Sequence, residues 1–309
     1  MAERGSVVIT GASRGLGLAS AAHLYRRGWT VVAAARSPEA GLDRLRAATG
    51  AAAGDPRLVA VRLDLDDPAS IVAAARAIGE AVGAPDALVH NAGVAAVGCV
   101  EEMPASVYAR VFSTNFFGPV RLTQALLPAM RAAGRGRIVV VSSQGAVRGM
   151  PTISAYSAAK GALERWAEAL ALEVAPFGIG VTVLVAGTFK TDILALTQSY
   201  ADPDGPYAAH HAGLDRIERW VLRTARPPER FAPALARALT ERAPFTRHMV
   251  GPDARAMALG SRLLPGRLFQ RAAGLAMGLP KPGSLRGDLA RLAAVTPRPE
   301  ETEEREARG

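Results

Sequence analysis

The stretch Thr10-Gly11-Ala12-Ser13-Arg14-Gly15-Leu16-Gly17 follows a short apolar run and opens a helical pattern. Gly11 permits a tight exit from a strand, Gly15 lets a ligand approach the backbone, and Gly17 lets the helix pack close to a sheet. The helix N-terminus offers free N–H groups and a positive dipole to a pyrophosphate. This strand–turn–helix context predicts a dinucleotide cradle, with further contacts from Ser13, Arg14 and Leu16.

Outward from this turn, short β-branched runs alternate with longer amphipathic segments. The runs are bounded by Gly, Pro or charged residues, as buried strands are, and a further strand is expected just before Gly251. The alternation predicts an α/β fold, a doubly wound Rossmann fold with a parallel seven-stranded sheet and helices on both faces. The expected strands are 7–10, 30–35, 58–63, 87–90, 137–142 and 181–185, and helical spacing covers 15–27, 68–82, 105–131 and 154–175.

The alternation continues to about residue 252, so we expect a single Rossmann domain over residues 1–252. Within it, residues 192–229 hold Asp, Pro, Gly, Tyr and paired His, and are expected to form a substrate lid. Residues 253–295 are basic and amphipathic and predict a C-terminal helical extension. Residues 296–309 are charged and contain Pro, which is typical of a disordered tail.

The composition argues against several classes of protein. The 309 residues carry a formal net charge of +9, but nearly all the cations are Arg and they are spread along an Ala-rich chain, so no nucleic-acid partner is expected. Cys99 is the only cysteine, which excludes an intramolecular disulfide and fits a reducing compartment. The N-terminus runs directly into the first strand, and no apolar stretch reaches the roughly 18 residues of a membrane span. We expect a soluble, cytoplasmic protein.

The end of the second strand, Ala33-Ala34-Ala35-Arg36-Ser37, indicates which dinucleotide is bound. Chains that bind NAD usually place an acidic residue here to hold the adenosine ribose hydroxyls. A carboxylate would repel a 2′-phosphate, whereas the planar guanidinium of Arg36 attracts it. Arg14 reaches the same phosphate from the glycine turn, and Ser37 offers a hydroxyl. The cofactor is therefore predicted to be NADP(H), with a solvated surface arginine as the alternative interpretation of Arg36.

These residues make the chain resemble the non-extended branch of the short-chain dehydrogenase/reductase family. The glycine turn looks like the family signature, and Leu63-Asp64-Leu65 resembles the third-strand segment that contacts adenine. Asn91-Ala92-Gly93 resembles the segment that lies along the cofactor, and Asn115 resembles the Asn of the active-site helix. The similarity runs from residue 5 to about residue 191 and weakens after that.

Tyr156 and Lys160 are four residues apart, so they share one face of a helix. Ser143 closes the preceding strand, and its place 13 residues before Tyr156 resembles the Ser/Tyr pair of the family. Hydride transfer needs a proton donor for the developing alkoxide, and a nearby ammonium lowers the pKa of a tyrosine. We predict that Tyr156 is the general acid/base, with its pKa lowered by Lys160, and that Ser143 polarises the carbonyl. The resemblance implies that Lys160 also holds the nicotinamide ribose, and that Asn115 anchors a water linking Lys160 to solvent.

After the sixth strand, Ala186-Gly187-Thr188-Phe189-Lys190-Thr191 resembles the family's Pro-Gly loop, which has a Thr four residues after the Gly. Gly187, Thr188 and Thr191 are expected to contact the cofactor, with backbone N–H groups directed to its carboxamide. Ala186 replaces the proline, so we expect a less rigid loop entry and a slightly altered cofactor affinity.

Other chemically capable residues are expected to be structural or incidental. His90 precedes Asn91 at a strand end and is interpreted as a structural histidine. His210 and His211 lack a surrounding group of ligand residues, so no metal is expected. Cys99 has no evident base partner and is expected to be incidental.

The last third of the chain bears on the substrate. β-Ketoacyl reductases usually stop soon after their seventh strand, whereas this chain continues past residue 255 with an apolar and basic run. That run resembles the steroid- and retinol-dehydrogenase-like group, so we expect interconversion of a hydrophobic ketone or aldehyde and its alcohol, with a steroid-, retinoid- or lipid-like substrate. A β-ketoacyl thioester reductase and a non-catalytic NADP(H)-binding sensor are the alternatives. Apolar lid residues either line the pocket or pack the lid on the sheet: Phe189, Ile193, Leu194, Leu196, Tyr200 and Tyr207.

Two further expectations concern partners. The family commonly pairs the helices around 105–131 and 154–175, so we expect a homodimer. Leucines alternate with arginines between residues 247 and 298. A helix packed beside the substrate pocket is the preferred interpretation of this run, ahead of a helix lying on an anionic membrane surface.

Overall fold

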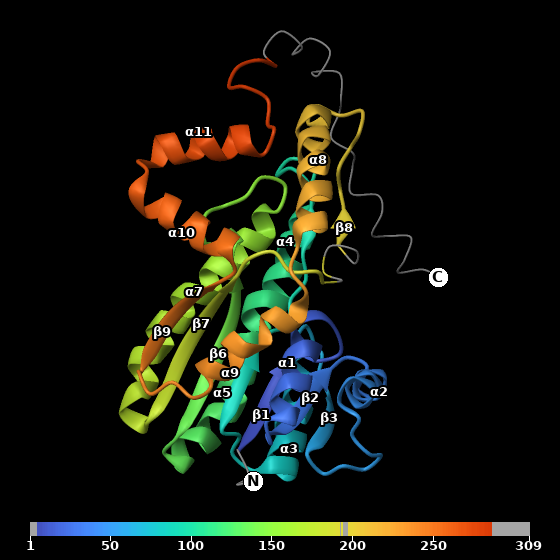
Figure 1. The fold of residues 1–309 in the computed structure, drawn as a ribbon, viewed down its shortest axis with the longest axis vertical. Helices are drawn as coiled ribbons and strands as arrows, with labels where there is room; N and C mark the ends of the chain where they lie inside the picture. Colours follow the sequence, from blue (N-terminus) through green and yellow to red (C-terminus); the bar gives the residue numbers. More distant parts are fainter. Residues whose placement is uncertain (1–4, 192, 194–196, 286–309) are drawn as a thin grey trace.

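The computed structural model describes residues 5–191, 193 and 197–285, and its centre is a seven-stranded sheet (Figure 1). All neighbouring strands of this sheet pair in parallel, which confirms the predicted Rossmann architecture. Most strand positions are buried because helices cover both faces, and this burial accounts for the β-branched runs. The strands are β1 (Ser6–Thr10), β2 (Thr30–Ala35), β3 (Leu58–Arg62), β4 (Ala87–His90), β6 (Gly136–Ser143), β7 (Ile179–Ala186) and β9 (Phe245–Val250).

The strands lie in the order β3-β2-β1-β4-β6-β7-β9, so the winding direction reverses between β1 and β4. The loops that follow these two strands leave the carboxyl edge of the sheet beside each other. Open α/β sheets bind their ligands in the crevice at such a reversal. The glycine turn after β1 and residues 91–93 after β4 both lie there.

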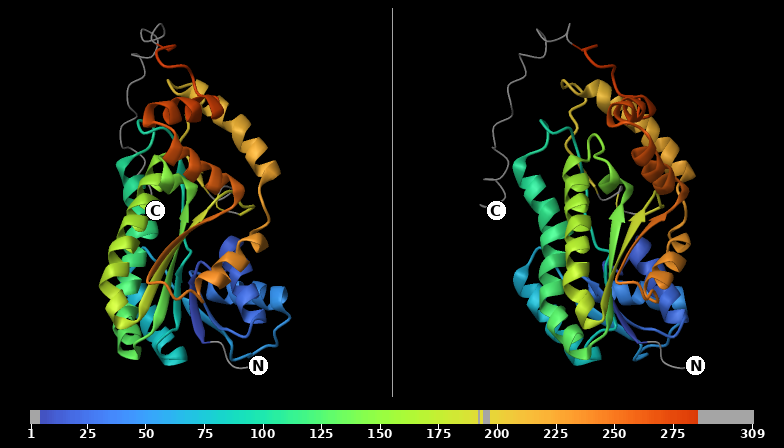
Figure 2. Two further views of the ribbon diagram at one scale, coloured as in Figure 1. Left: turned by 60° about the vertical axis from the view of Figure 1, so that its left-hand side comes forward. Right: turned by 90° about the vertical axis from the view of Figure 1, so that its left-hand side faces the viewer.

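Helices cover the two faces of the sheet in separate layers (Figure 2). Successive strand residues alternate between these layers, so that Val7 and Ile9 belong to one core and Val8 to the other. Burying a side chain of this size contributes about 1.5–3 kcal/mol. One face is covered by α1 (Gly15–Arg26), α2 (Pro38–Thr49) and α9 (Ala232–Ala238), and the other by α3 (Pro68–Val82), α5 (Gly118–Ala133) and α7 (Ser154–Val174).

The helix expected over residues 105–131 is interrupted. It consists of α4 (Ala105–Phe112), a π-helical turn η1 (Ser113–Phe117) and α5. Short π-helical turns inside α-helices are frequent at functional sites, and this one carries Asn115. Helix α2 had no counterpart among the expected helices; it begins at Pro38, a favourable first helical residue, and ends at Gly50 with a φ of 74°.

A group of helices, which we call the cap, lies beyond the carboxyl edge of the sheet (Figures 1 and 2). It consists of α8 (Ala208–Thr224) from the expected lid region and of α10 (Pro252–Leu263) and α11 (Gly266–Ala276), which confirm the C-terminal helical extension. The parts of the cap touch closely, since a Cβ on Gly213 would lie 2.4 Å from the carbonyl oxygen of Gly278. The shorter elements are β5 (Ala96–Val97), which pairs with β8 (Gln198–Ser199), and α6 (Gln144–Val147), η2 (Ala175–Phe177) and η3 (Pro228–Arg230).

No helix within the described ranges is long and apolar enough to cross a membrane. The expected disordered tail at 296–309 lies outside the described residues, as do Leu194 and Leu196 of the expected lid.

Candidate active site

The glycine turn has the backbone shape that the sequence predicts. Gly11 and Gly15 have φ values of 68° and 52°, which side chains disfavour. A Cβ on Gly17 would lie 2.2 Å from the carbonyl oxygen of Gly11, so only glycine lets α1 start this close to the strand. The turn therefore presents bare backbone and the N-terminus of α1 at the crevice, which fits the pyrophosphate of a dinucleotide.

Asn91 braces this turn with its side chain. Its Nδ2 donates to the carbonyl oxygens of Thr10, at 2.9 Å, and Gly11, at 3.3 Å. The Thr10 hydroxyl oxygen in turn accepts from the backbone N–H groups of Asn91 and Ala92, both at 3.0 Å. The sequence places Asn91 along the cofactor; the structure adds that its amide joins the loops after β1 and β4.

The residues expected around the adenosine lie at the ends of β1, β2 and β3. Arg14 is the residue before α1, Ser37 is the residue before α2, and both are exposed, as is Arg36. Asp64 is half-buried, and its Oδ1 accepts from the backbone N–H of Asp66 at 3.1 Å. Two guanidinium groups are thus free to meet an anionic group at this end of the crevice.

The adjacent Leu65 is buried beneath the helix start at Gly118, where a Cβ would lie 2.6 Å from Cβ of Leu65. Ser13, in the glycine turn, uses its carbonyl oxygen to accept from Nη1 of Arg44 at 3.2 Å. Leu16 is half-buried and packs against the core. Leu65, Ser13 and Leu16 thus contact the protein around the crevice through the interactions just described.

Tyr156 and Ser143 form a side-chain hydrogen bond, as expected for a catalytic pair. Ser143 ends β6 and its hydroxyl oxygen also accepts from the backbone N–H of Gly145 at 3.2 Å. Burial raises the pKa of Tyr156, and the hydrogen bond with Ser143 offsets only part of that rise. The sequence predicts a pKa lowered by Lys160; in the protein alone burial dominates, because Nζ of Lys160 lies 5.9 Å from the centre of the tyrosine ring.

Lys160 is held in the crevice by the strand next to it. Its side chain is 3% exposed, and Nζ donates to the carbonyl oxygen of Val141 at 2.9 Å. Burial lowers the pKa of Lys160 to about 8, against an opposing effect from Glu164. A Cβ on Gly93 would lie 3.4 Å from Nζ of Lys160, so the ammonium faces the bare backbone of the loop after β4.

Asn115 lies close to Gly93, as Lys160 does. Its side chain is fully buried, with Oδ1 accepting from the N–H of Val94 and Nδ2 donating to the carbonyl oxygen of Val94, both at 2.8 Å. A Cβ on Gly93 would lie 3.2 Å from Oδ1 of Asn115. The structure therefore brings together all four predicted catalytic residues around residues 93 and 143.

A buried carboxylate that sequence reasoning missed lies one helical turn beyond Lys160. Glu164 accepts from the Ser142 hydroxyl at 2.7 Å and from Nε and Nη2 of Arg247 at 3.0 and 2.8 Å. These bonds tie α7 to β6 and β9, so they fix the helix that carries Tyr156 and Lys160. The i, i+4 spacing of Lys160 and Glu164 was the available signal, but nothing in the sequence indicated Arg247.

Asp253 is a second missed residue, and it supports the loop after β7. Its Oδ2 accepts from the backbone N–H of Thr188 at 2.5 Å, and a Cβ on Gly187 would lie 2.0 Å from its Oδ1. Gly187 is thus needed for the close approach of Asp253, which braces the loop entry where Ala186 replaces the usual proline. Thr191, farther along, lies against the glycine turn, since a Cβ on Gly15 would be 3.3 Å from its side chain.

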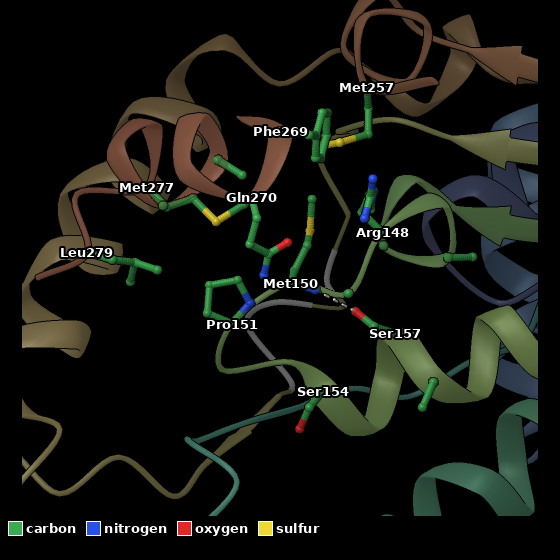
Figure 3. A pocket seen from close by; sticks show the side chains of 16 residues that line it. Arg148, Met150, Pro151, Ser154, Ser157, Met257, Phe269, Gln270, Met277 and Leu279 are labelled. Atoms are coloured by element: carbon green, nitrogen blue, oxygen red, sulfur yellow. Dashed lines mark hydrogen bonds between the residues drawn. The ribbon is translucent and has the colours of Figure 1, made fainter. Parts of the chain in front are cut away.

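A pocket of about 480 Å³ opens between the loop after α6, the start of α7 and the cap (Figure 3). A Cβ on Gly145, which lines it, would lie 3.7 Å from Oγ of Ser143 and 3.9 Å from a ring carbon of Tyr156. Gly145 therefore lies between the pocket and Ser143 and Tyr156, which do not line the pocket themselves. Its largest side chains are mostly apolar and come from both walls: Met150, Pro151, Met257, Phe269, Met277 and Leu279.

The pocket is built by different residues from those expected in the lid. Phe189 is buried in the core and packs edge-to-face on Phe231, with ring centres 5.6 Å apart. Tyr200 packs beside α4, and the Tyr207 hydroxyl donates to Glu101 at 2.7 Å. These three side chains follow the second of the two interpretations, packing. Helix α11, from the run expected to pack beside the substrate pocket, supplies one wall of the pocket.

His90 is structural, as predicted. It is 1% exposed, its Nε2 lies 2.7 Å from the Thr123 hydroxyl, and burial lowers its pKa to about 3. Cys99 and His211 differ from expectation, because the fold brings both beside Glu102, with ligand atoms of the three residues within 4.8 Å of one another. Glu102 follows Cys99 by three residues, but the contact with His211 spans 109 positions and leaves no local signal.

Comparisons with known proteins agree with this geometry. A family model described as short chain dehydrogenase matches residues 6–201. The chain is 34% identical over 247 residues to an oxidoreductase of Botryotinia fuckeliana, covering 80% of this chain and 88% of that protein. It is 32% identical over 276 residues to a 3-ketodihydrosphingosine reductase of Bacteroides thetaiotaomicron, covering 86% and 95%.

Solved structures of dehydrogenases and reductases share this fold. A short-chain dehydrogenase from Streptomyces avermitilis superposes with a TM-score of 0.74 at 34% identity, covering 96% of this chain and 100% of that chain. A 3-ketoacyl-(acyl-carrier-protein) reductase from Brucella melitensis, solved with NADH, superposes with a TM-score of 0.66 at 26% identity. With the glycine turn, the Ser143–Tyr156 pair and Lys160 in one crevice, the protein belongs to the short-chain dehydrogenase family of oxidoreductases.

Proposed function

We propose that the protein is an NADP(H)-dependent reductase of a ketone or aldehyde that carries a long apolar, lipid-like tail. The observation that carries this proposal is the largely apolar pocket that Gly145 separates from Ser143 and Tyr156. A cavity of about 480 Å³ lies within the range of small-molecule sites, roughly 300–1,000 Å³, and is large enough for a bulky substrate.

The reaction needs a proton at the carbonyl oxygen. A bound nicotinamide supplies the hydride. Tyr156 donates the proton to the developing alkoxide, and the Ser143 hydroxyl hydrogen-bonds the same oxygen and orients it. Because burial raises the pKa of Tyr156, the phenol remains protonated at neutral pH in the protein alone, and the protonated form is the one that serves reduction.

Lys160 and Asn115 prepare this proton donor. The ammonium of Lys160 lies 5.9 Å from the centre of the Tyr156 ring and faces residue 93, so it would hold positive charge near the phenol and near the ribose of a bound cofactor. Asn115 holds the loop at Val94 in place by two buried hydrogen bonds. These bonds keep the crevice rigid, which limits the reorganisation that the reaction requires.

The preference for NADP(H) rests on Arg14 and Arg36. Both guanidinium groups are exposed: Arg14 directly precedes α1, and Arg36 directly follows β2. No acidic residue lies at the end of β2. A planar guanidinium binds a phosphate through two parallel hydrogen bonds, and Ala33-Ala34-Ala35-Arg36-Ser37 offers no carboxylate to repel that phosphate.

The choice of a lipid-like substrate is also supported by similarity to the Bacteroides 3-ketodihydrosphingosine reductase, which covers 86% of this chain. The test is an NADPH oxidation assay with a long-chain 3-oxo sphingoid base, a steroid ketone, retinal and an acetoacetyl thioester. We expect turnover of the long-chain ketone, abolished in Tyr156→Phe. Turnover of the thioester alone would replace the proposal with a β-ketoacyl reductase, and tight NADPH binding without any turnover would replace it with a sensor.

A further inference from the structure

Outside the crevice, three side chains of different chemistry meet beneath the cap. Cys99 and Glu102 lie in the loop that follows β5, and His211 lies in the first turn of α8. Nε2 of His211 is 2.8 Å from both carboxylate oxygens of Glu102. All three are largely shielded from solvent, with Cys99 9% and His211 8% exposed.

The carboxylate in this cluster is held in a fixed orientation. Oε2 of Glu102 accepts from the backbone N–H of Cys99 at 2.7 Å, and Oε1 accepts from the N–H of Asp202 at 3.3 Å. Hydrogen bonds of this kind from an outer shell orient metal ligands. The loop before α4, the segment after β8 and α8 therefore converge on one carboxylate.

These residues match the ligand types of one class of ion. Zinc and similar cations bind thiolate sulfur, imidazole nitrogen and carboxylate oxygen, usually with four ligands in a tetrahedron. Calcium and magnesium require oxygen ligands and do not fit a thiol with an imidazole. One ligand atom of each residue lies within 4.8 Å of the others, so the ligands reach tetrahedral spacing with small side-chain movements.

We infer that Cys99, Glu102 and His211 form a binding site for a zinc-class divalent cation that fastens α8 to the loop after β5. On binding, the Cys99 thiol proton leaves to solvent. The proton on Nε2 of His211 passes by solvent exchange to Nδ1, so that Nε2 exchanges its contact with Glu102 for the metal, and a water completes the coordination. No redox change takes place. The site lies outside the proposed catalytic machinery and fixes a cap helix above the crevice.

A hydrogen-bonded pair of His211 and Glu102 alone is the competing interpretation. That pair would hold α8 without a metal; Cys99 would then contact Glu102 through its backbone N–H, and its sulfur would bind no cation. The two interpretations therefore differ in whether the sulfur acquires a metal bond. Cys99 is the only cysteine of the chain, so any thiolate-to-metal absorption of the protein must come from this residue.

The test is titration of the full, tag-free and metal-free chain with Co²⁺, followed by Zn²⁺. We expect one bound Co²⁺ per chain, a thiolate-to-cobalt charge-transfer band, and loss of that band as Zn²⁺ displaces cobalt. Cys99→Ser and His211→Gln should weaken Co²⁺ binding by about 100-fold or more and remove the band. His210→Gln is the matched control, because His210 packs on Tyr207 with ring centres 5.4 Å apart and should leave binding unchanged.

Absence of the charge-transfer band in the wild-type chain would overturn the inference, as would a band that persists in His211→Gln. Cys99→Ser keeps the His211–Glu102 contact, so its thermal unfolding without metal should match wild type. Added Zn²⁺ should raise the unfolding temperature of the wild-type chain and of His210→Gln, but not that of Cys99→Ser. An equal rise in all three would also contradict the site.

Discussion

The carboxyl edge of the sheet and the cap above it are built in opposite ways. At the sheet edge, Asn115 and Lys160 are 0% and 3% exposed and each is tied to backbone carbonyl or N–H groups. In the cap, Leu263, Leu268 and Leu275 are 71%, 53% and 71% exposed. The groups proposed to transfer the proton are fixed in a region where a displacement breaks buried hydrogen bonds, whereas the cap exposes much of its apolar surface.

Tyr156→Phe changes the buried sheet edge, and we expect it to have the largest effect on activity. Removing the phenolic proton donor is expected to lower kcat/KM by about 10²–10⁴-fold for every carbonyl that the enzyme accepts. NADPH binding, followed by fluorescence, should change little because the ring remains. Tyr25→Phe is the matched control, since its hydroxyl contacts Asp55 away from the crevice. Equal losses in both variants would show that the effect is structural.

Arg36→Ala should affect the cofactor end of the same edge. Loss of a charge-assisted contact worth about 1.5–3 kcal/mol would raise KM for NADPH by roughly 10–100-fold and leave KM for NADH nearly unchanged. Arg76→Ala, on the exposed face of α3, is the control and should change neither constant. A parallel rise in both KM values would show that Arg36 does not select the phosphate.

Ala273→Trp changes the cap and leaves the sheet edge unaltered. Ala273 lines the pocket, so an indole there should lower kcat/KM for a long-chain ketone by about tenfold and leave a short ketone unaffected. Ala272→Trp adds the same ring at the exposed neighbouring position. If the two variants lower long-chain turnover equally, the pocket beside α11 does not receive the substrate tail.

Lys160→Met should increase the free energy of unfolding, because the wild-type protein buries a charged ammonium at the sheet edge. The pKa of Lys160 falls from its usual 10.5 to about 8, equivalent to roughly 3 kcal/mol against the charged form. Replacement removes this cost but also removes the hydrogen bond to the Val141 carbonyl, so we expect a net gain of about 1–2 kcal/mol in unfolding free energy at pH 7, with turnover abolished.

The pH dependence of this gain follows from the sign of the shift. Between pH 8 and 10.5 the unfolded chain keeps the lysine proton that the folded chain has released, so the wild-type protein gains stability as pH rises. Urea unfolding should therefore show the difference between the variant and wild type narrowing from pH 7 to pH 10. A constant difference would place the effect in packing and not in the charge.

Much of the site at the sheet edge could be predicted because its signals are local. The glycine turn, the end of β2 and the Tyr156–Lys160 spacing each lie within one strand–turn–helix unit or one helix. The alternation of such units allows few topologies, so the parallel sheet and its crevice follow from the same pattern. The interrupted helix at Asn115 was missed. The π-helical turn ends beside Gly118, which approaches Leu65 closely, and Leu65 is distant in the sequence.

The local sequence pattern was enough to predict the parallel sheet and the dinucleotide cradle, and to nominate the residues proposed to move the proton. Only the tertiary structure decided how Glu164 meets Arg247, how Asp253 braces residue 188, which side chains line the pocket, and that Cys99, Glu102 and His211 converge. The physical reason is the distance along the chain. Backbone geometry relates residues within one or two turns, whereas contacts across 65 to 109 positions arise only when separate elements pack.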